Sequence, residues 1–117
     1  MHKIKELKVW QKAIQLAVKI YKITEELPVN EKFGLTSQIR RCSVSIASNI
    51  AEGAGRNTNG EFRQFLGIAN GSAFELQTQL LITLELKFVG HEVMEEVLDN
   101  IDEIQKMIFN LQKRLGN

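Results

Sequence analysis

The chain has 117 residues, of which 44% are hydrophobic and 25% charged, and its formal net charge at pH 7 is +1. This size and composition are those of one globular domain, which can bury a stable core without disulfide bonds or structural metal ions. No apolar run is long enough to cross a bilayer, and the amino terminus lacks the apolar stretch of a signal peptide. The single cysteine, Cys42, excludes an internal disulfide and fits a reducing compartment. We therefore expect a cytoplasmic, single-domain protein over residues 1–117, with no membrane partner.

The first predicted helix runs from about Lys5 to Glu26, because the residue before Pro28 disfavours helical geometry. Its apolar residues form two adjacent stripes: Val9, Ala13, Leu16, Ile20 and Leu27, and Leu7, Trp10, Ile14, Ala17 and Tyr21. Together the stripes span roughly 200° of the helix circumference. One bundle core requires a narrower arc, so we expect a second buried contact here, most simply with another subunit and including Trp10 and Tyr21.

Charge is unevenly distributed along the chain. Residues 1–24 contain six lysines and one glutamate, whereas residues 89–117 contain six acidic and three basic residues. One face of the first helix carries a lysine at every third or fourth position, except that Gln15 fills the gap between Lys12 and Lys19: Lys5, Lys8, Lys12, Lys19 and Lys22. Such an array could bind a phosphate backbone with salt-dependent, sequence-independent affinity. The alternatives are an ordinary solvated face and attraction between the first and last helices.

The second predicted helix runs from about Leu35 to Gly53, with Ile39, Cys42, Ile46 and Ile50 on its apolar stripe and Gly53 and Gly55 ending it. A polar set lies opposite: Gln38, Arg41, Ser45, Asn49, Glu52 and Arg56. Serine and asparagine are poor helix-interior residues, so we expect a polar network between helices or subunits. Arg40 lies on an apolar face, where a carboxylate such as Glu75 would allow its burial. Structural roles are expected for Asn49 and Glu52, and either role for the arginines.

The third predicted helix begins near Thr58, which forms a capping box with Glu61, and ends near Phe88. Within it, Gly67 and Gly71 indicate either close approach by a neighbouring backbone or a slight kink. The fourth runs from about Glu92 to Leu115 with a coiled-coil-like apolar seam of Met94, Val97, Ile101, Ile104, Ile108, Leu111 and Leu115. Four helices with short connections predict an all-α, antiparallel up-down four-helix bundle.

The sequence contains no recognisable motif for catalysis or metal binding. Neither His2 nor His91 follows a glutamate at di-iron spacing, and no cysteine pair is present for zinc. Cys42 lies on an apolar stripe, and no serine has a histidine base nearby in sequence. The glycines at 53, 55 and 60 follow a helix rather than a strand and lack the lysine of a phosphate loop. We therefore expect no enzyme, no metal and no cofactor.

The second and third predicted helices, and the loop between them, contain a series of short sequence motifs. They are Gln38-Ile39-Arg40-Arg41, Ser45-Ile46, Ser48-Asn49-Ile50-Ala51-Glu52-Gly53 and Gly55-Arg56, followed by Glu61-Phe62, Phe65-Leu66, Ile68-Ala69, Gly71-Ser72 and Glu75-Leu76. Together with Leu7-Lys8-Val9-Trp10 at the start of the first helix, these motifs closely resemble those of the four-helix-bundle protein family. That family includes proteins encoded in intervening sequences of bacterial 23S ribosomal RNA genes and the accessory variability protein of diversity-generating retroelements.

The resemblance implies a bacterial homopentameric barrel without catalytic residues. In the retroelement branch the barrel's basic surface binds nucleic acid and a reverse transcriptase, and a net charge of only +1 is less than that branch favours. Two functions remain open. The first is a nucleic-acid-associated module that binds RNA or DNA through Lys5, Lys8, Lys12, Lys19, Lys22, Arg41 and Arg56. The second is a structural or protein-adaptor bundle, in which Arg40, Ser45, Asn49, Glu52, Glu75, Trp10 and Tyr21 order the core or the oligomer interface.

Overall fold

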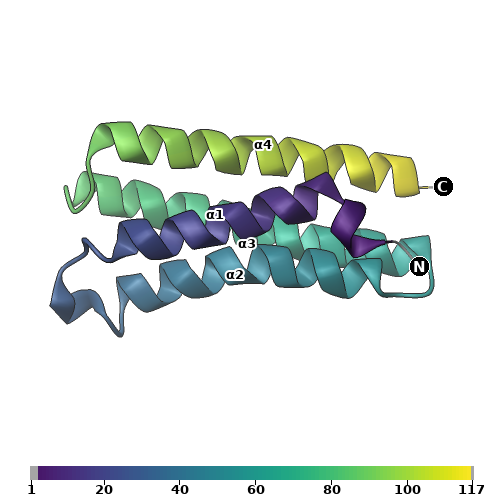
Figure 1. Ribbon diagram of the computed structural model, residues 1–117, viewed down its shortest axis with the longest axis horizontal. Coiled ribbons are helices and arrows are strands. Elements are labelled where there is room, and N and C mark those ends of the chain that lie inside the picture. Colours follow the sequence, from purple (N-terminus) through teal and green to yellow (C-terminus); the bar gives the residue numbers. More distant parts are fainter. Residues whose placement is uncertain (1–2, 117) are drawn as a thin grey trace.

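The computed structural model describes residues 3–116 as four long helices: α1 Lys8–Thr24, α2 Leu35–Ala54, α3 Asn59–Glu85 and α4 His91–Leu115. Short 3₁₀ turns at Ile4–Glu6 and Val29–Glu31 precede α1 and α2, and the described part of the chain contains no strand. Successive helices run in opposite directions, so the chain reverses at one end after α1 and α3 and at the other end after α2 (Figure 1). The predicted all-α, up-down four-helix bundle is confirmed.

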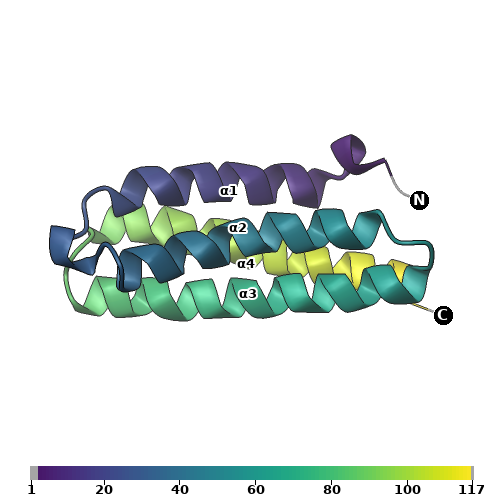
Figure 2. The ribbon, with the colours of Figure 1, turned by 90° about the horizontal axis from the view of Figure 1, so that it is seen from below.

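Each helix packs against two neighbours, with α2 and α4 each contacting both α1 and α3 (Figure 2). The predicted apolar positions fill the space between them. All seven residues of the α4 seam are at most 9% exposed, and α1 contributes Val9, Ala13, Leu16 and Ile20. Opposite them, α2 buries Ile39, Ile46 and Ile50, and α3 buries Phe62, Leu66, Leu76 and Leu80. Burial of these side chains is the main source of the bundle's stability.

Several helix ends differ from the predicted ones by one or two residues, and two of them differ by three. The first helix begins at Lys8 rather than Lys5, because a 3₁₀ turn occupies Ile4–Glu6 and Leu7 adopts an extended conformation. The Gln11 side-chain amide donates a 2.6 Å hydrogen bond to the Lys5 carbonyl across this break. The third helix ends at Glu85 rather than Phe88, since Lys87 has a left-handed φ of 62° that helical geometry does not allow.

The predicted capping box at the start of α3 is present. The Thr58 hydroxyl oxygen accepts a hydrogen bond from the Glu61 backbone N–H at 3.1 Å. The same hydroxyl donates to the Glu61 carboxylate at 3.1 Å, so the carboxylate meets the Thr58 side chain rather than its backbone. This pair satisfies one of the otherwise open N–H groups at the start of the helix.

Close approach between helices occurs at Gly53, which lies inside α2 and does not end it. A Cβ atom at this position would lie 2.8 Å from Phe62 Cδ1 and 2.8 Å from Phe65 Cβ on α3. At Gly67 the only neighbour would be the side chain of Gln112, and at Gly71 nothing would lie within 4 Å. Of the two alternatives for Gly67 and Gly71, close approach by a neighbouring backbone does not occur within residues 3–116, because both glycines are exposed.

Candidate nucleic-acid and subunit interface

Two of the five lysines on the predicted basic face form ion pairs with α4. The Lys12 Nζ lies 3.0 Å from Glu103 Oε1, and the Lys19 Nζ lies 2.6 Å from Glu96 Oε1. Lys19 also donates to Asn100 Oδ1 at 3.0 Å. The first and last helices thus attract one another, as one of the alternative interpretations held. Such partly exposed pairs add little stability, but they leave only three of the five lysines on this face unpaired.

The other candidate cations have no salt bridge within residues 3–116 and are exposed: Lys5, Lys8, Lys22, Arg41 and Arg56. They are spread over several elements and do not form one continuous stripe. Lys5 precedes α1, Lys22 borders a groove between α1 and α2, and Arg41 lies on α2. Arg56 follows α2, and its guanidinium stacks on the Phe65 ring at 4.7 Å from the centroid. Their uncompensated charge leaves them able to bind phosphates.

Part of the predicted polar network joins α2 to α3. The Ser45 and Ser72 hydroxyls lie 2.9 Å apart, and the Asn49 amide donates to the Ser45 carbonyl at 2.8 Å and to its hydroxyl at 3.0 Å. Asn49 is half-buried, whereas Glu52 is exposed with no salt bridge in the described chain. The link between the two helices is made by Ser45 and Ser72, while the Asn49 amide bonds to Ser45 within α2.

Arg40 has partners other than the predicted Glu75. Its Nε donates to the Thr24 hydroxyl at 2.8 Å and its Nη2 donates to the Tyr21 carbonyl at 3.2 Å, both on α1. Its guanidinium also stacks on the Tyr21 ring at 4.6 Å from the centroid. Glu75 instead lies across the α2–α3 seam, where its charge acts on Cys42. The side of α2 that carries Arg40 faces α1, and this packing could not be read from the periodicity alone.

An apolar groove of about 460 Å³ lies between α1 and α2. Its apolar lining comes from the second stripe of α1 and the flank of α2: Ile14, Ala17, Val18, Tyr21, Val44 and Ala47. Ile14, Val18, Tyr21 and Val44 are 38–50% exposed in the chain as it stands. Trp10, by contrast, is half-buried against the bundle core. The second apolar stripe of the first helix therefore has two environments. Trp10 packs against the bundle core, whereas Tyr21 lines the open groove.

The α3 helix and its C-cap residue, Leu86, carry further exposed apolar side chains. Ile68, Ile82 and Leu86 are 47–52% exposed, and Phe74 and Leu81 are 55% and 44% exposed. Their spacing places the first three on one side of the helix and the last two on another. The chain thus has apolar surfaces on more than one side, in addition to the groove between α1 and α2.

Sequence reasoning missed a second hollow, at the connection between α1 and α2. It is lined by Tyr21, Lys32, Phe33, Thr36, Ser37, Arg40, Arg41, Val44 and Ser45. Phe33 is 90% exposed there. The sequence did contain a sign of it. Phe33 follows Lys32 in a short segment between two helices, where an aromatic side chain cannot reach the bundle core.

The thiol of Cys42 is half-buried at the α2–α3 seam. Burial and the negative charge of Glu75 raise the pKa of this thiol above its usual value, against smaller opposing effects of Gln79 and Arg41. A raised pKa means less thiolate at any given pH, and the thiolate is the reactive form. This environment is that of a packing residue and not of a nucleophile.

We expect Cys42 to react with Ellman's reagent several-fold more slowly in the folded protein than in urea at pH 8, because burial limits both access and ionisation. The rise of the rate with pH should also shift to higher pH in the folded protein. Stopped-flow absorbance measures both. Equal rates in the two states would show that the thiol is freely exposed.

Within residues 3–116, no group of three histidine, cysteine, aspartate or glutamate side chains is placed to hold a metal ion. None of the helices described between these limits is long and apolar enough to span a membrane.

Comparison with known proteins places this architecture. Residues 5–110 match the family described as 23S rRNA-intervening sequence protein. The chain belongs to this family. Among the solved structures, it is similar to a protein of unknown function from the S23 ribosomal protein family of Bacteroides thetaiotaomicron, with a TM-score of 0.83 and 27% sequence identity over 90% of this chain and 95% of that one. No curated protein matches the chain significantly.

Proposed function

We propose that this member of the 23S rRNA-intervening sequence protein family is a cytoplasmic, non-enzymatic homo-oligomer, a pentamer by analogy with its relatives, that binds nucleic acid such as ribosomal RNA. The observation that carries the proposal is the open groove between α1 and α2. Its lining is apolar and belongs to two well-packed helices, so the groove is preformed rather than a gap in a loose core. Exposed apolar surface that is gathered in one place marks an interaction site.

A second copy of the chain is the occupant that best fits the groove. Lys22 and Glu25 both border it, so its rim offers one charge of each sign to a partner. The exposed apolar residues of α3 form different surfaces on the same chain. When a groove on one subunit receives a different surface of the next, the contact is heterologous, and it closes into a ring when the rotation between successive subunits returns to the first one. This geometry supports a ring rather than a two-fold dimer.

The unpaired cations support nucleic-acid binding. Each copy of the chain has exposed lysines and arginines without an acidic partner in the described residues, although the whole chain is nearly neutral. Assembly repeats these cations around the ring. Several weak phosphate contacts on one particle then act together, because the second contact is made at high effective concentration.

Two double variants test this assignment of the charge. Replacing Lys5 and Lys8 with glutamine removes unpaired cations just before and at the start of α1, and replacing Lys12 and Lys19 removes paired ones within α1. We expect K5Q/K8Q to weaken binding of a structured RNA roughly tenfold at low salt and to lower the salt slope by about 1 to 2. The K12Q/K19Q protein should lose less than about threefold, since those charges are already compensated. Filter binding across a salt series measures both.

Equal losses in the two double variants would contradict this division of the lysines. If neither variant nor the wild type binds RNA at low salt while the mass in solution remains that of an oligomer, the alternative function holds. That alternative is a protein-adaptor bundle. It is favoured by the pairing of Lys12 and Lys19 with α4, which uses part of the basic face for internal contacts.

A further inference from the structure

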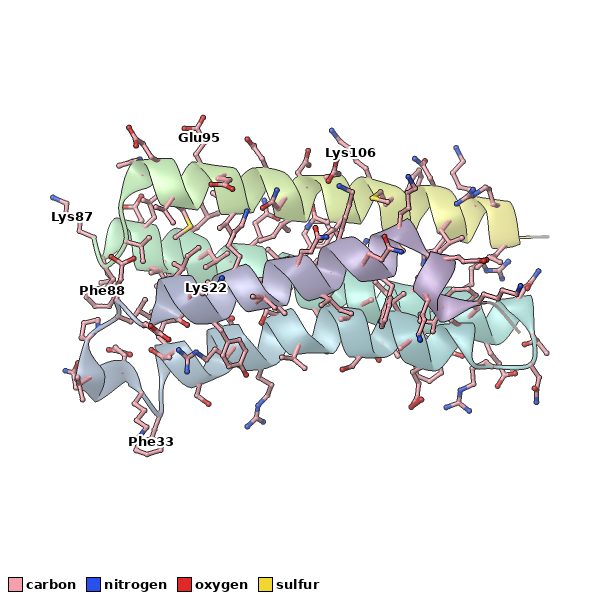
Figure 3. The ribbon with its side chains drawn as sticks, in the orientation of Figure 1. Lys22, Phe33, Lys87, Phe88, Glu95 and Lys106 are labelled. Atoms are coloured by element: carbon pink, nitrogen blue, oxygen red, sulfur yellow. The ribbon has the colours of Figure 1, made fainter. Side chains whose placement is uncertain are left out.

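The hollow beside Phe33 combines features that the bundle itself does not need. It lies between the segment from Pro28 to Gly34 and the first half of α2, and its volume is about 640 Å³. Phe33 is 90% exposed, and Figure 3 shows it projecting from the α1–α2 connection away from the helices. An exposed phenylalanine contributes nothing to the core. The hollow has the size of a site for a small ligand.

Three cations line the same hollow as this aromatic residue: Lys32, Arg40 and Arg41. The Lys32 ammonium lies 5.5 Å from the Phe33 ring centroid. The Arg40 guanidinium is held in place by its bonds to Thr24 and Tyr21, which are neutral groups. None of the three cations has a salt bridge in the described part of the chain. A half-buried arginine with no anion beside it is a ready partner for a phosphate.

The start of α2 adds hydrogen-bond donors to the same hollow. Gly34 supplies no side-chain cap, and the Leu35 N–H donates to the Glu31 carboxylate at 3.3 Å. The N–H groups of Thr36 and Ser37 are left without an acceptor among residues 3–116. Thr36 is only 7% exposed, and its hydroxyl has no hydrogen-bond partner either. The Glu31 carboxylate is one anion at the positive end of this twenty-residue helix, and the open N–H groups of Thr36 and Ser37 remain for a second one.

We propose that this hollow binds one nucleotide unit of a single-stranded nucleic acid, with its base stacked on Phe33 and its phosphate among Lys32, Arg40 and Arg41. Base stacking on an exposed aromatic side chain beside basic groups is how single strands are bound without sequence preference. This inference rests on the proposed function and deepens it. It assigns the strand contact to the α1–α2 connection, whereas the lysines of α1 supply only diffuse attraction.

The variants Phe33→Leu and Arg41→Gln test the site, because both residues are exposed and outside the core. Phe109 on α4 supplies the control: it is 57% exposed, and the Lys113 ammonium lies 5.4 Å from its ring centroid. This second aromatic–lysine pair lies near the carboxyl end of α4, so no helix start lies beside it, and it does not line the hollow. Fluorescence anisotropy with a labelled, mixed-sequence 12-nucleotide single-stranded RNA measures affinity, and light scattering measures the mass of each protein.

We expect F33L to weaken strand binding by at least fivefold, R41Q by several-fold, and F109L by less than twofold, with all masses unchanged. Competition with uridine monophosphate against the labelled strand distinguishes a strand site from a nucleotide site. Displacement of the strand by the mononucleotide only at far higher concentration assigns the site to a strand, whereas comparable affinity for the mononucleotide assigns it to a free nucleotide and overturns the strand proposal.

Three other outcomes would also overturn the inference. Equal binding by F33L and F109L, with the wild type still binding RNA, removes the site and leaves the proposed function standing. A changed mass for F33L makes the hollow a contact between subunits. Absence of RNA binding by the wild type removes the proposed function and this inference together.

Discussion

Replacing Gly53 with alanine should lower the free energy of unfolding by about 2 kcal/mol, although alanine is the better helix former. The added Cβ would lie 2.8 Å from Phe62 Cδ1, 2.8 Å from Phe65 Cβ and 3.2 Å from the Phe62 carbonyl oxygen. Two of these contacts are shorter than any relaxed packing allows, and two of the three atoms cannot rotate away. Helices α2 and α3 must therefore separate where both are buried.

Gly71 supplies the matched control. It lies in the interior of α3, and a Cβ there would meet nothing within 4 Å. We expect Gly71→Ala to raise the free energy of unfolding by about 0.5–1 kcal/mol, the usual gain for this change in an exposed helix. Urea unfolding followed by circular dichroism, at one protein concentration for all three proteins, measures both values. A G53A protein as stable as G71A would show that α2 and α3 do not touch at this point.

Replacing Val44 with lysine should dissociate the assembly into 13.3 kDa monomers. Val44 is 42% exposed and lines the groove between α1 and α2, so the change leaves the core of the single chain intact. In an assembled ring the lysine would be buried against an apolar partner surface. The cost of burying an unpaired ammonium exceeds what one subunit contact can offset.

The control for this variant is Val29→Lys, the same change at a valine that is 88% exposed and lies outside the groove. Light scattering after size-exclusion chromatography should give the wild-type mass for V29K and the monomer mass for V44K, with the same helix content in both. Two variants of equal, oligomeric mass would show that the groove is not the contact between subunits.

Much of the fold follows from local rules. The α4 seam, the capping box at Thr58 and the stop before Pro28 each depend on neighbouring residues, and each is present in the structure. The start of α1 was predicted three residues too early, because periodicity continues through Leu7 while the backbone there is extended. Periodicity reports which side of a segment is apolar, and it does not report where hydrogen bonding begins.

The arrangement of the candidate site was harder to predict. The pairing of Lys12 with Glu103 and of Lys19 with Glu96 joins residues that are far apart in sequence, and it depends on the rotation of α1 against α4. Arg40 illustrates the same limit, since its stripe faces α1 and not α3. The exposure of Phe33 depends on how the α1–α2 connection leaves the bundle. Such facts arise from tertiary packing, which a one-dimensional pattern does not contain.

The salt dependence of RNA binding by the unmodified protein tests the account most directly. We expect the logarithm of the observed association constant for a structured RNA to fall linearly with the logarithm of salt concentration, with a slope of several units, because each phosphate contact contributes about 0.7 to 0.9. A flat dependence, or no binding at low salt, would contradict a nucleic-acid role for this bundle.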